Sequence, residues 1–280
     1  MSIAYDKRVT AARSDLAAVH LKGKIEAARF VEGRALQAAR PVIDLRDGPS
    51  DDAGLDTQIL FGESFTVYEE KNGWLWGQCA LDSYVGYARA DAFVEFAAPT
   101  HRVVARSTTL LSAPEVKKPS RGWLPLNAKL TITETQDRYA RLSNGLYVFE
   151  GHVAPLSSHA PDWLAVAERL EGVPYLWGGK TATGIDCSGL VQTALEAGGI
   201  SSPRDTDMME KGLGVSLPLD APLKRGDLVF WQRHVGAMLD GARLIHANAH
   251  FMQVTIEPLA KARARIESAE GLAVRTIKRL

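Results

Sequence analysis

The pattern of the sequence changes at Pro155, and this change constrains the fold more than any other feature. Before it, short alternating apolar runs are separated by Gly, Asn and Asp, as in small antiparallel sheets. After it, apolar residues recur at helical spacing before further strand-like runs begin. The chain has 280 residues, which is more than one core needs, so we expect several domains.

The part before Pro155 predicts two small all-β barrels, at residues 35–98 and 99–156. They follow an N-terminal segment, residues 1–34, whose role the sequence does not indicate. Asn72-Gly73 predicts a hairpin because these residues accept the positive φ of a tight turn. A weak repeat, in which Trp74-Leu75-Trp76 corresponds to residues 139–142, indicates two copies of one β module.

Residues 157–280 predict a helix-first α+β domain. Asp162 is the expected N-cap of a first helix, and a second helix is expected to start near Cys187 and end at Gly198-Gly199. The runs LVFW, VGAML, ARLIHAN and QVTIE then predict strands, followed by a helix over PLAKARARIES and a last strand over LAVRTIKRL.

Cys187 is the first candidate for chemistry. Asp186 is a plausible N-cap, so the thiol would lie in the first turn of the second helix. The helix dipole there favours the thiolate, and free backbone N–H groups can stabilise an oxyanion. The local sequence is equally compatible with a buried structural cysteine at a helix start.

His234 and His246 are the second and third candidates. We expect a three-residue loop, residues 239–241, with Gly241 in the left-handed region, so that residue 234 pairs with 246 on one face of a hairpin. His246 would then orient His234 as a general base, with the Cys187 sulfur roughly 3 to 4 Å from the His234 imidazole. The alternative for His234 is an ordinary histidine at a strand edge.

Composition narrows the classes of partner. Lys plus Arg and Asp plus Glu both number 33, so nothing favours nucleic acid. We find no apolar run that could span a membrane and no secretory signal, and the two cysteines suit a reducing compartment, so we expect a cytoplasmic protein. His246 and His250 are not part of a zinc-spaced cluster, and we predict no metal and no cofactor.

Several ordered blocks of the C-terminal part resemble the NlpC/P60 cysteine peptidases. The blocks are PYLWGGKTATGIDCSGLVQTAL, PRDTDMM, LKRGDLVFW, HVGAML and LIHAN, and the match covers roughly residues 161–280. The resemblance implies a circularly permuted papain-like fold with Cys187 as nucleophile, His234 as base and His246 as the orienting residue. It further implies substrate or oxyanion contacts for Tyr175, Asp186, Ser188, Arg204, Asp205 and Thr206.

The two β modules resemble bacterial SH3 (SH3b) domains, as in γ-D-glutamyl-L-diamino acid endopeptidases. That resemblance implies cleavage of L-Ala-γ-D-Glu-diamino acid murein peptides, and we expect this to occur during cell-wall recycling. It also implies that Glu63 and Tyr84 bind the free amino end of the substrate, although a surface acid and a packing tyrosine explain them equally well. The rival functions are a wall-binding SH3b protein with an inactive catalytic domain, and an amidase or acyltransferase on the same fold. The preferred diamino acid and the oligomeric state are not indicated.

Overall fold

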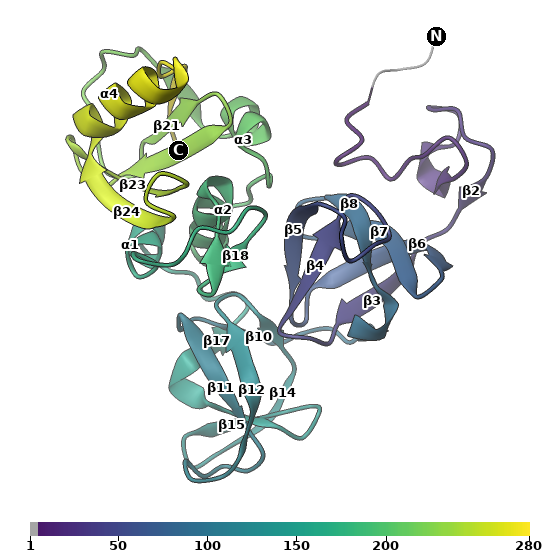
Figure 1. The fold of residues 1–280 in the computed structure, drawn as a ribbon. Helices are drawn as coiled ribbons and strands as arrows, with labels where there is room; N and C mark the ends of the chain where they lie inside the picture. Colours follow the sequence, from purple (N-terminus) through teal and green to yellow (C-terminus); the bar gives the residue numbers. More distant parts are fainter. Residues whose placement is uncertain (1–4) are drawn as a thin grey trace. The chain divides into compact units, whose positions relative to one another are not determined.

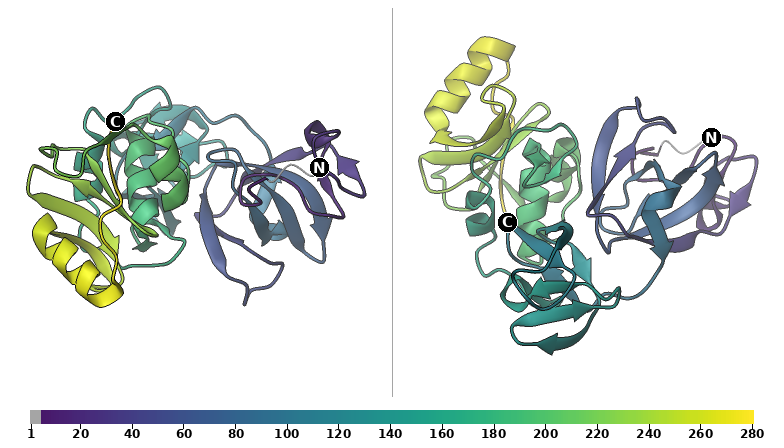
Figure 2. Two further views of the ribbon diagram at one scale, coloured as in Figure 1. Left: turned by 90° about the horizontal axis from the view of Figure 1, so that it is seen from above. Right: turned by 60° about the horizontal axis from the view of Figure 1, so that its bottom comes forward.

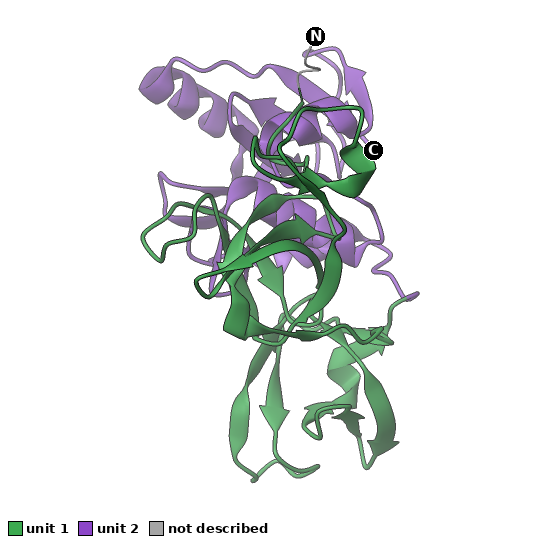
Figure 3. Ribbon diagram, turned by 90° about the vertical axis from the view of Figure 1, so that its right-hand side faces the viewer, with its two compact units in different colours: residues 1–156 green, residues 157–280 purple. Residues whose placement is uncertain are grey.

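The chain divides into two compact units, Met1–Leu156 and Ser157–Leu280 (Figure 3). The structure, a computed structural model, describes residues 5–280, so the first four residues of the predicted N-terminal segment lie outside it. Within the described residues, every helix is too short or too polar to cross a membrane.

The first β module of unit 1 is one antiparallel sheet in the order β5-β4-β8-β7-β6-β3-β9. Its strands are β3 Arg34–Ala38, β4 Val42–Arg46, β5 Leu55–Leu60, β6 Ser64–Lys71, β7 Trp74–Cys79, β8 Val85–Arg89 and β9 Phe93–Glu95, with the 3₁₀ turn η2 Ala90–Ala92 between the last two. The predicted hairpin is confirmed, because Lys71 pairs with Trp74 around Asn72 and Gly73, whose φ values are 52° and 79°. β5 and β9 are the edges of the sheet, so the strand pairing does not close the predicted small barrel.

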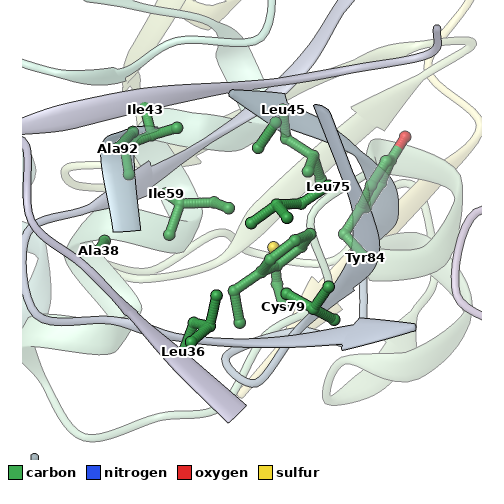
Figure 4. Packing of buried hydrophobic residues seen from close by; sticks show 12 residues of the cluster. Leu36, Ala38, Ile43, Leu45, Ile59, Leu75, Cys79, Tyr84 and Ala92 are labelled. Atoms are coloured by element: carbon green, nitrogen blue, oxygen red, sulfur yellow. The ribbon is translucent and has the colours of Figure 1, made fainter. Parts of the chain in front are cut away.

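Alternate residues of these strands form the core of the first module (Figure 4). The labelled members are Leu36, Ala38, Ile43, Leu45, Ile59, Leu75, Cys79, Tyr84 and Ala92. This core explains the period-two pattern of the sequence, since the apolar residues of each strand face one side.

The N-terminal segment covers another face of this module. It contains β1 Ala17–Ala18, the 3₁₀ turn η1 Val19–Leu21 and β2 Phe30–Val31. Leu16 and Ala18 pack with Trp76 and Val85 in a second apolar cluster. The guanidinium of Arg13 lies 4.5 Å from the centre of the Trp76 ring. The segment is thus folded onto the module that follows it in the chain.

The second β module, residues 99–156, is built differently from the first. It has a five-stranded sheet, β12-β11-β16-β15-β14, and a three-stranded sheet, β13-β10-β17. The bounds are β10 His101–Val103, β11 Ser107–Leu111, β12 Ser120–Pro125, β13 Lys129–Leu130, β14 Ile132–Gln136, β15 Tyr139–Leu142, β16 Tyr147–Phe149, η3 Glu150–His152 and β17 Val153–Pro155. It has its own core around Val103, Leu124 and Leu130.

Unit 2 is an α+β domain around a six-stranded sheet in the order β20-β25-β21-β22-β23-β24. The strands are β20 Val215–Leu217, β21 Leu228–Trp231, β22 His234–Met238, β23 Arg243–Asn248, β24 Gln253–Pro258 and β25 Thr276–Arg279, with the short pair β18 Lys180–Thr181 and β19 Gly184–Ile185. The helices are α1 Trp163–Glu168, α2 Cys187–Ala197, α3 Thr206–Gly212 and α4 Leu259–Glu270. The helix-first order is as predicted, but α3 was not anticipated.

Two helices cover the two faces of this sheet. α4 packs Leu259, Ala262 and Ile266 against Met238 and Leu244. α2 packs against β22 and β23 and lies on the opposite side of the sheet from α4 (Figures 1 and 2). Because side chains alternate along a strand, residues 234, 236 and 238 of β22 share the face that α4 covers.

Candidate active site

Cys187 is the first residue of α2, as the sequence predicted. Asp186 precedes the helix as N-cap, and its carboxylate accepts a hydrogen bond from the Gly189 N–H at 2.6 Å. The N–H groups of the first turn have no acceptor within their own helix. The thiol therefore lies where backbone donors are concentrated.

Asp186 and Arg204 form a buried ion pair next to Cys187. The guanidinium of Arg204 donates to the two carboxylate oxygens of Asp186 at 3.0 and 2.6 Å, and to Ser188 Oγ at 2.8 Å. Asp186 also accepts from the Gly178 N–H at 2.8 Å. None of the three side chains is among the residues that line the cavity beside Cys187. They hold the turn in place, and the expected contact of Asp186, Ser188 and Arg204 with substrate stays a prediction.

Cys187 is only 7% exposed and lines a cavity of about 320 Å³. Its Sγ lies 3.9 Å from both the Thr206 hydroxyl and the Arg233 carbonyl oxygen, and it also contacts the backbone N–H of Val235. His234 lines the same cavity but is not a hydrogen-bond partner of the thiol. The two residues thus share one cavity, and the predicted separation of roughly 3 to 4 Å between sulfur and imidazole stays a prediction.

His234 and His246 share one sheet face, but through a register that differs from the predicted one. Ala237 pairs with Ile245 and Met238 with Leu244, so β23 is shifted by two residues from the expected pairing. The cause is Asp240, whose carboxylate accepts from the N–H groups of residues 242 and 243 at 2.8 Å each and widens the loop. A shift of two residues preserves the face, so the two histidines still meet.

The two imidazoles are directly hydrogen-bonded. His234 Nε2 lies 2.8 Å from His246 Nδ1. This contact leaves Nδ1 as the ring nitrogen of His234 that is free for the thiol or a substrate. His246 is fully buried, whereas His234 is partly exposed at the cavity wall.

Glu257 extends this chain of contacts and was missed by the sequence analysis. Its Oε1 lies 2.9 Å from His246 Nε2, and Arg265 of α4 pairs with the same carboxylate. His246 pairs with Thr255 across β23 and β24, so Glu257 is its diagonal neighbour on one face. The alternation in QVTIE can place Glu257 on the same sheet face as His246, but only when the register of the two strands is known.

Burial sets the protonation of Cys187 and His234. Desolvation, together with the Asp186 carboxylate, raises the pKa of the Cys187 thiol to about 11. Desolvation, together with His246 and Arg265, lowers the pKa of His234. The resting pair is a thiol and a neutral imidazole, so burial outweighs the helix dipole that we expected to favour the thiolate.

Tyr175 and Thr206 also lie at the site. Tyr175 lines the cavity, and burial, together with the neighbouring Cys187 and Asp186, raises the pKa of its hydroxyl, which therefore keeps its proton. Thr206 begins α3, with Asp205 at the preceding N-cap position. Trp177 and His250 complete the rim. Within residues 5–280, no group of three or more His, Cys, Asp or Glu side chains is arranged to hold a metal ion.

Glu63 and Tyr84 belong to unit 1, and the structure gives both a packing role there. Glu63 is buried and accepts a hydrogen bond from the Leu60 N–H at 3.0 Å, and Lys129 Nζ lies 3.5 Å from its other oxygen. Tyr84 is part of the core of the first module (Figure 4). The carboxylate predicted to bind a substrate ammonium group is thus already paired with a lysine of the second module.

Two families match parts of the chain. Residues 172–266 match the NlpC/P60 family, and residues 45–93 match the bacterial dipeptidyl-peptidase SH3 domain. The SH3 match covers the first β module only, so the second SH3b domain, like the circular permutation, stays a prediction from the sequence.

Curated relatives and a solved structure agree with these matches. A γ-D-glutamyl-L-lysine dipeptidyl-peptidase of Bacillus subtilis is 29% identical over 243 residues, covering 74% of this chain and 77% of the relative. Dipeptidyl-peptidase 6 of Lysinibacillus sphaericus is 27% identical, covering 74% and 85%. The crystal structure of an NlpC/P60 family protein from Bacillus cereus superimposes with a TM-score of 0.74 at 20% identity, covering 88% of this chain and 99% of that one. The chain therefore carries an NlpC/P60 domain, with a bacterial SH3 domain ahead of it.

Proposed function

We propose that the chain is a cysteine peptidase that hydrolyses the bond between the γ-carboxyl of D-glutamate and a diamino acid in murein peptides. One observation carries the proposal. Cys187, at the start of a helix, shares a cavity with His234, which is held by His246. A nucleophile, a base and a group that orients the base are the parts that acyl transfer by covalent catalysis requires.

The first half-reaction forms a thioester. As Sγ of Cys187 attacks the γ-glutamyl carbonyl carbon, the thiol proton passes to His234, which is neutral at rest because burial lowers its pKa. The C–N bond then breaks, and the imidazolium returns the proton to the departing amine. The acyl group stays on Cys187 with its γ-carbonyl bound to sulfur.

The second half-reaction releases the acid. His234 takes a proton from water, the hydroxide attacks the thioester carbonyl, and the thiolate that leaves regains a proton from the imidazolium. The backbone N–H of the first helical residue and the Tyr175 hydroxyl are the candidate donors to the oxyanion in both steps, because both belong to residues lining the cavity. The reaction needs no oxidant, reductant or cofactor.

The substrate class follows from the relatives. The Bacillus subtilis and Bacillus cereus relatives are named γ-D-glutamyl-L-lysine dipeptidyl-peptidases. We extend that bond type to this chain, with a free L-Ala-γ-D-Glu end on the substrate. The cytoplasmic location and the part played in cell-wall recycling stay predictions.

The test is incubation of the full chain with L-Ala-γ-D-Glu-L-Lys, and with its diaminopimelate counterpart, followed by mass spectrometry of the products. We expect the dipeptide L-Ala-D-Glu and the free diamino acid. Binding without any product would favour a wall-binding protein with an inactive domain. Release of ammonia from the D-isoglutamine form of the peptide, which carries a primary amide, would favour the amidase, and transfer of the dipeptide to an added amine without hydrolysis would favour the acyltransferase.

A further inference from the structure

Glu257 ends a line of polar side chains that crosses three neighbouring strands. His234 lies on β22, His246 on β23 and Glu257 on β24, and each side chain contacts the next. His246 is fully buried, so its two ring nitrogens have only these two partners to satisfy them among the described residues. A buried chain of this kind fixes where each proton lies.

The direction of the protons follows from the carboxylate. Glu257 is ionised at neutral pH, because the His246 hydrogen bond and the charge of Arg265 outweigh the effect of burial and lower its pKa. An ionised carboxylate only accepts hydrogen bonds, so Nε2 of His246 must carry the proton. In the neutral ring Nδ1 is then an acceptor, and it receives the proton that His234 carries on Nε2.

We propose that Glu257 is a positioning residue that sets the tautomers of both imidazoles and thereby leaves the lone pair of His234 on Nδ1. Without the carboxylate, His246 is free to carry its proton on Nδ1 and to donate it to His234 Nε2. His234 would then hold its own proton on Nδ1 and would have no lone pair to offer the thiol. This inference rests on the proposed role of His234 as the base.

Arg265 supports the arrangement from α4. Its guanidinium pairs with Glu257 and lies 5.2 Å from the centre of the Phe251 ring. The pair keeps the carboxylate charged and restricts its rotation. Arg265 also lines the cavity, so its replacement would change both the chain and the pocket. Glu257 is therefore the cleaner residue to vary.

The decisive variant is Glu257→Gln, which keeps the size of the side chain and removes its charge. The matched control is Asp227→Asn. Asp227 is 1% exposed and is paired with Arg279 at 2.7 and 2.6 Å, but it makes no contact with either imidazole. Both variants remove a carboxylate that pairs with an arginine in unit 2. A loss of activity caused only by lower stability should therefore appear in both.

We expect Glu257→Gln to lower kcat and leave KM nearly unchanged, whereas Asp227→Asn keeps both. Removing a carboxylate that touches the catalytic imidazole costs about 10⁴ in kcat in serine proteases. Glu257 acts through a second imidazole, so about 10- to 100-fold is expected here, as for outer-shell partners of histidine ligands. A folded Glu257→Gln protein with unchanged kcat would overturn the proposal.

Nitrogen-15 NMR of histidine-labelled wild-type protein tests the tautomers directly and requires no variant to fold. We expect His246 to be protonated on Nε2 and His234 on Nε2, with Nδ1 of each unprotonated. A proton on Nδ1 of His246 in the neutral ring would overturn the proposal. Glu257→Gln should broaden the imidazole nitrogen signals or reverse the two tautomers, and Asp227→Asn should leave both tautomers as in the wild type.

The rate of Cys187 alkylation separates this inference from the proposed function. If the murein peptides are not hydrolysed, alkylation still reports whether His234 can take the thiol proton. We expect slower alkylation in Glu257→Gln than in the wild type and in Asp227→Asn at the same pH. Equal rates in all three proteins, with native tautomers in Glu257→Gln, would show that Glu257 does not act through the imidazoles.

Discussion

At the scale of single residues, the site depends on a thiol that is buried rather than charged. Cys187 and Cys79 are almost equally covered, at 7% and 6% exposed. They differ in surroundings, since Cys187 opens onto a cavity that holds His234, whereas Cys79 is packed in an apolar core. The rate of alkylation should therefore distinguish the two cysteines, although their exposed fractions do not.

The alkylation of Cys187 should rise with pH well beyond the range of an ordinary thiol. An unperturbed cysteine titrates near a pKa of about 8.5. Because burial raises the pKa of Cys187 to about 11, the thiolate fraction, and with it the iodoacetamide rate, should still be increasing above pH 9. Peptide mapping by mass spectrometry gives the rate at each pH. A rate for Cys187 that is already at its plateau at pH 6 would mean a resting thiolate.

Hydrolysis should persist into mild acid. His234 must be neutral to accept the thiol proton, and its pKa is lowered by burial and by the neighbouring His246 and Arg265. The acid limb of kcat/KM should accordingly lie below the ordinary histidine pKa of about 6.5. A profile of kcat/KM from pH 4 to 9 measures this. An acid limb above pH 7 would contradict the neutral base.

At the scale of elements, α2 is held by a salt bridge that the solvent does not reach. Arg204 is 1% exposed and bonds Asp186 at the N-cap of the helix. Arg204→Ala leaves the carboxylate buried without its partner, which costs about 3 to 5 kcal/mol. Thermal or urea unfolding followed by circular dichroism should show this loss.

A matched control for that loss is the exposed pair of Arg243 and Asp240. Their side chains are 59% and 42% exposed. Arg243→Ala should change the free energy of unfolding by about 1 kcal/mol or less, because exposed ion pairs contribute little. Similar losses for the two arginine variants would refute the structural role assigned to the Asp186–Arg204 pair.

The elements that could be predicted from the sequence were those with local signals. The Asn72-Gly73 turn and the Asp162 and Asp186 caps each depend on a few neighbouring residues, and all three are confirmed. The register of β22 and β23 was wrong by two residues, because the side chain of Asp240 shapes the loop. Glu257 was missed for the same reason, since its neighbours follow from register and not from spacing.

At the scale of the whole molecule, the change of pattern at Pro155 predicted the division of the chain better than the internal repeat predicted the fold of the two β modules. Unit 2 starts at Ser157, close to that change. The weak repeat suggested two like modules, but the first is one seven-stranded sheet and the second has a five-stranded and a three-stranded sheet. Alternating strands indicate an all-β region without specifying which strands pair, because pairing is set by contacts distant in sequence.

The residues expected to meet substrate show the same limit. Asp186, Ser188 and Arg204 are buried and bonded to one another, which the sequence did not indicate. The family resemblance identified their positions in the chain, and their contact with substrate stays a prediction. For Cys187, His234 and His246 the structure adds a contact that supports the expected roles, because His234 lines the same cavity as Cys187 and lies against His246.

The most direct test of the central claim is the detection of a covalent acyl-enzyme. The full chain is mixed with L-Ala-γ-D-Glu-L-Lys, quenched in acid within the first turnovers, digested and examined by mass spectrometry. We predict an added L-Ala-D-Glu acyl group on the peptide that contains Cys187, none on the peptide with Cys79, and neither acylation nor hydrolysis in Cys187→Ala. Hydrolysis that continues in Cys187→Ala would contradict the account.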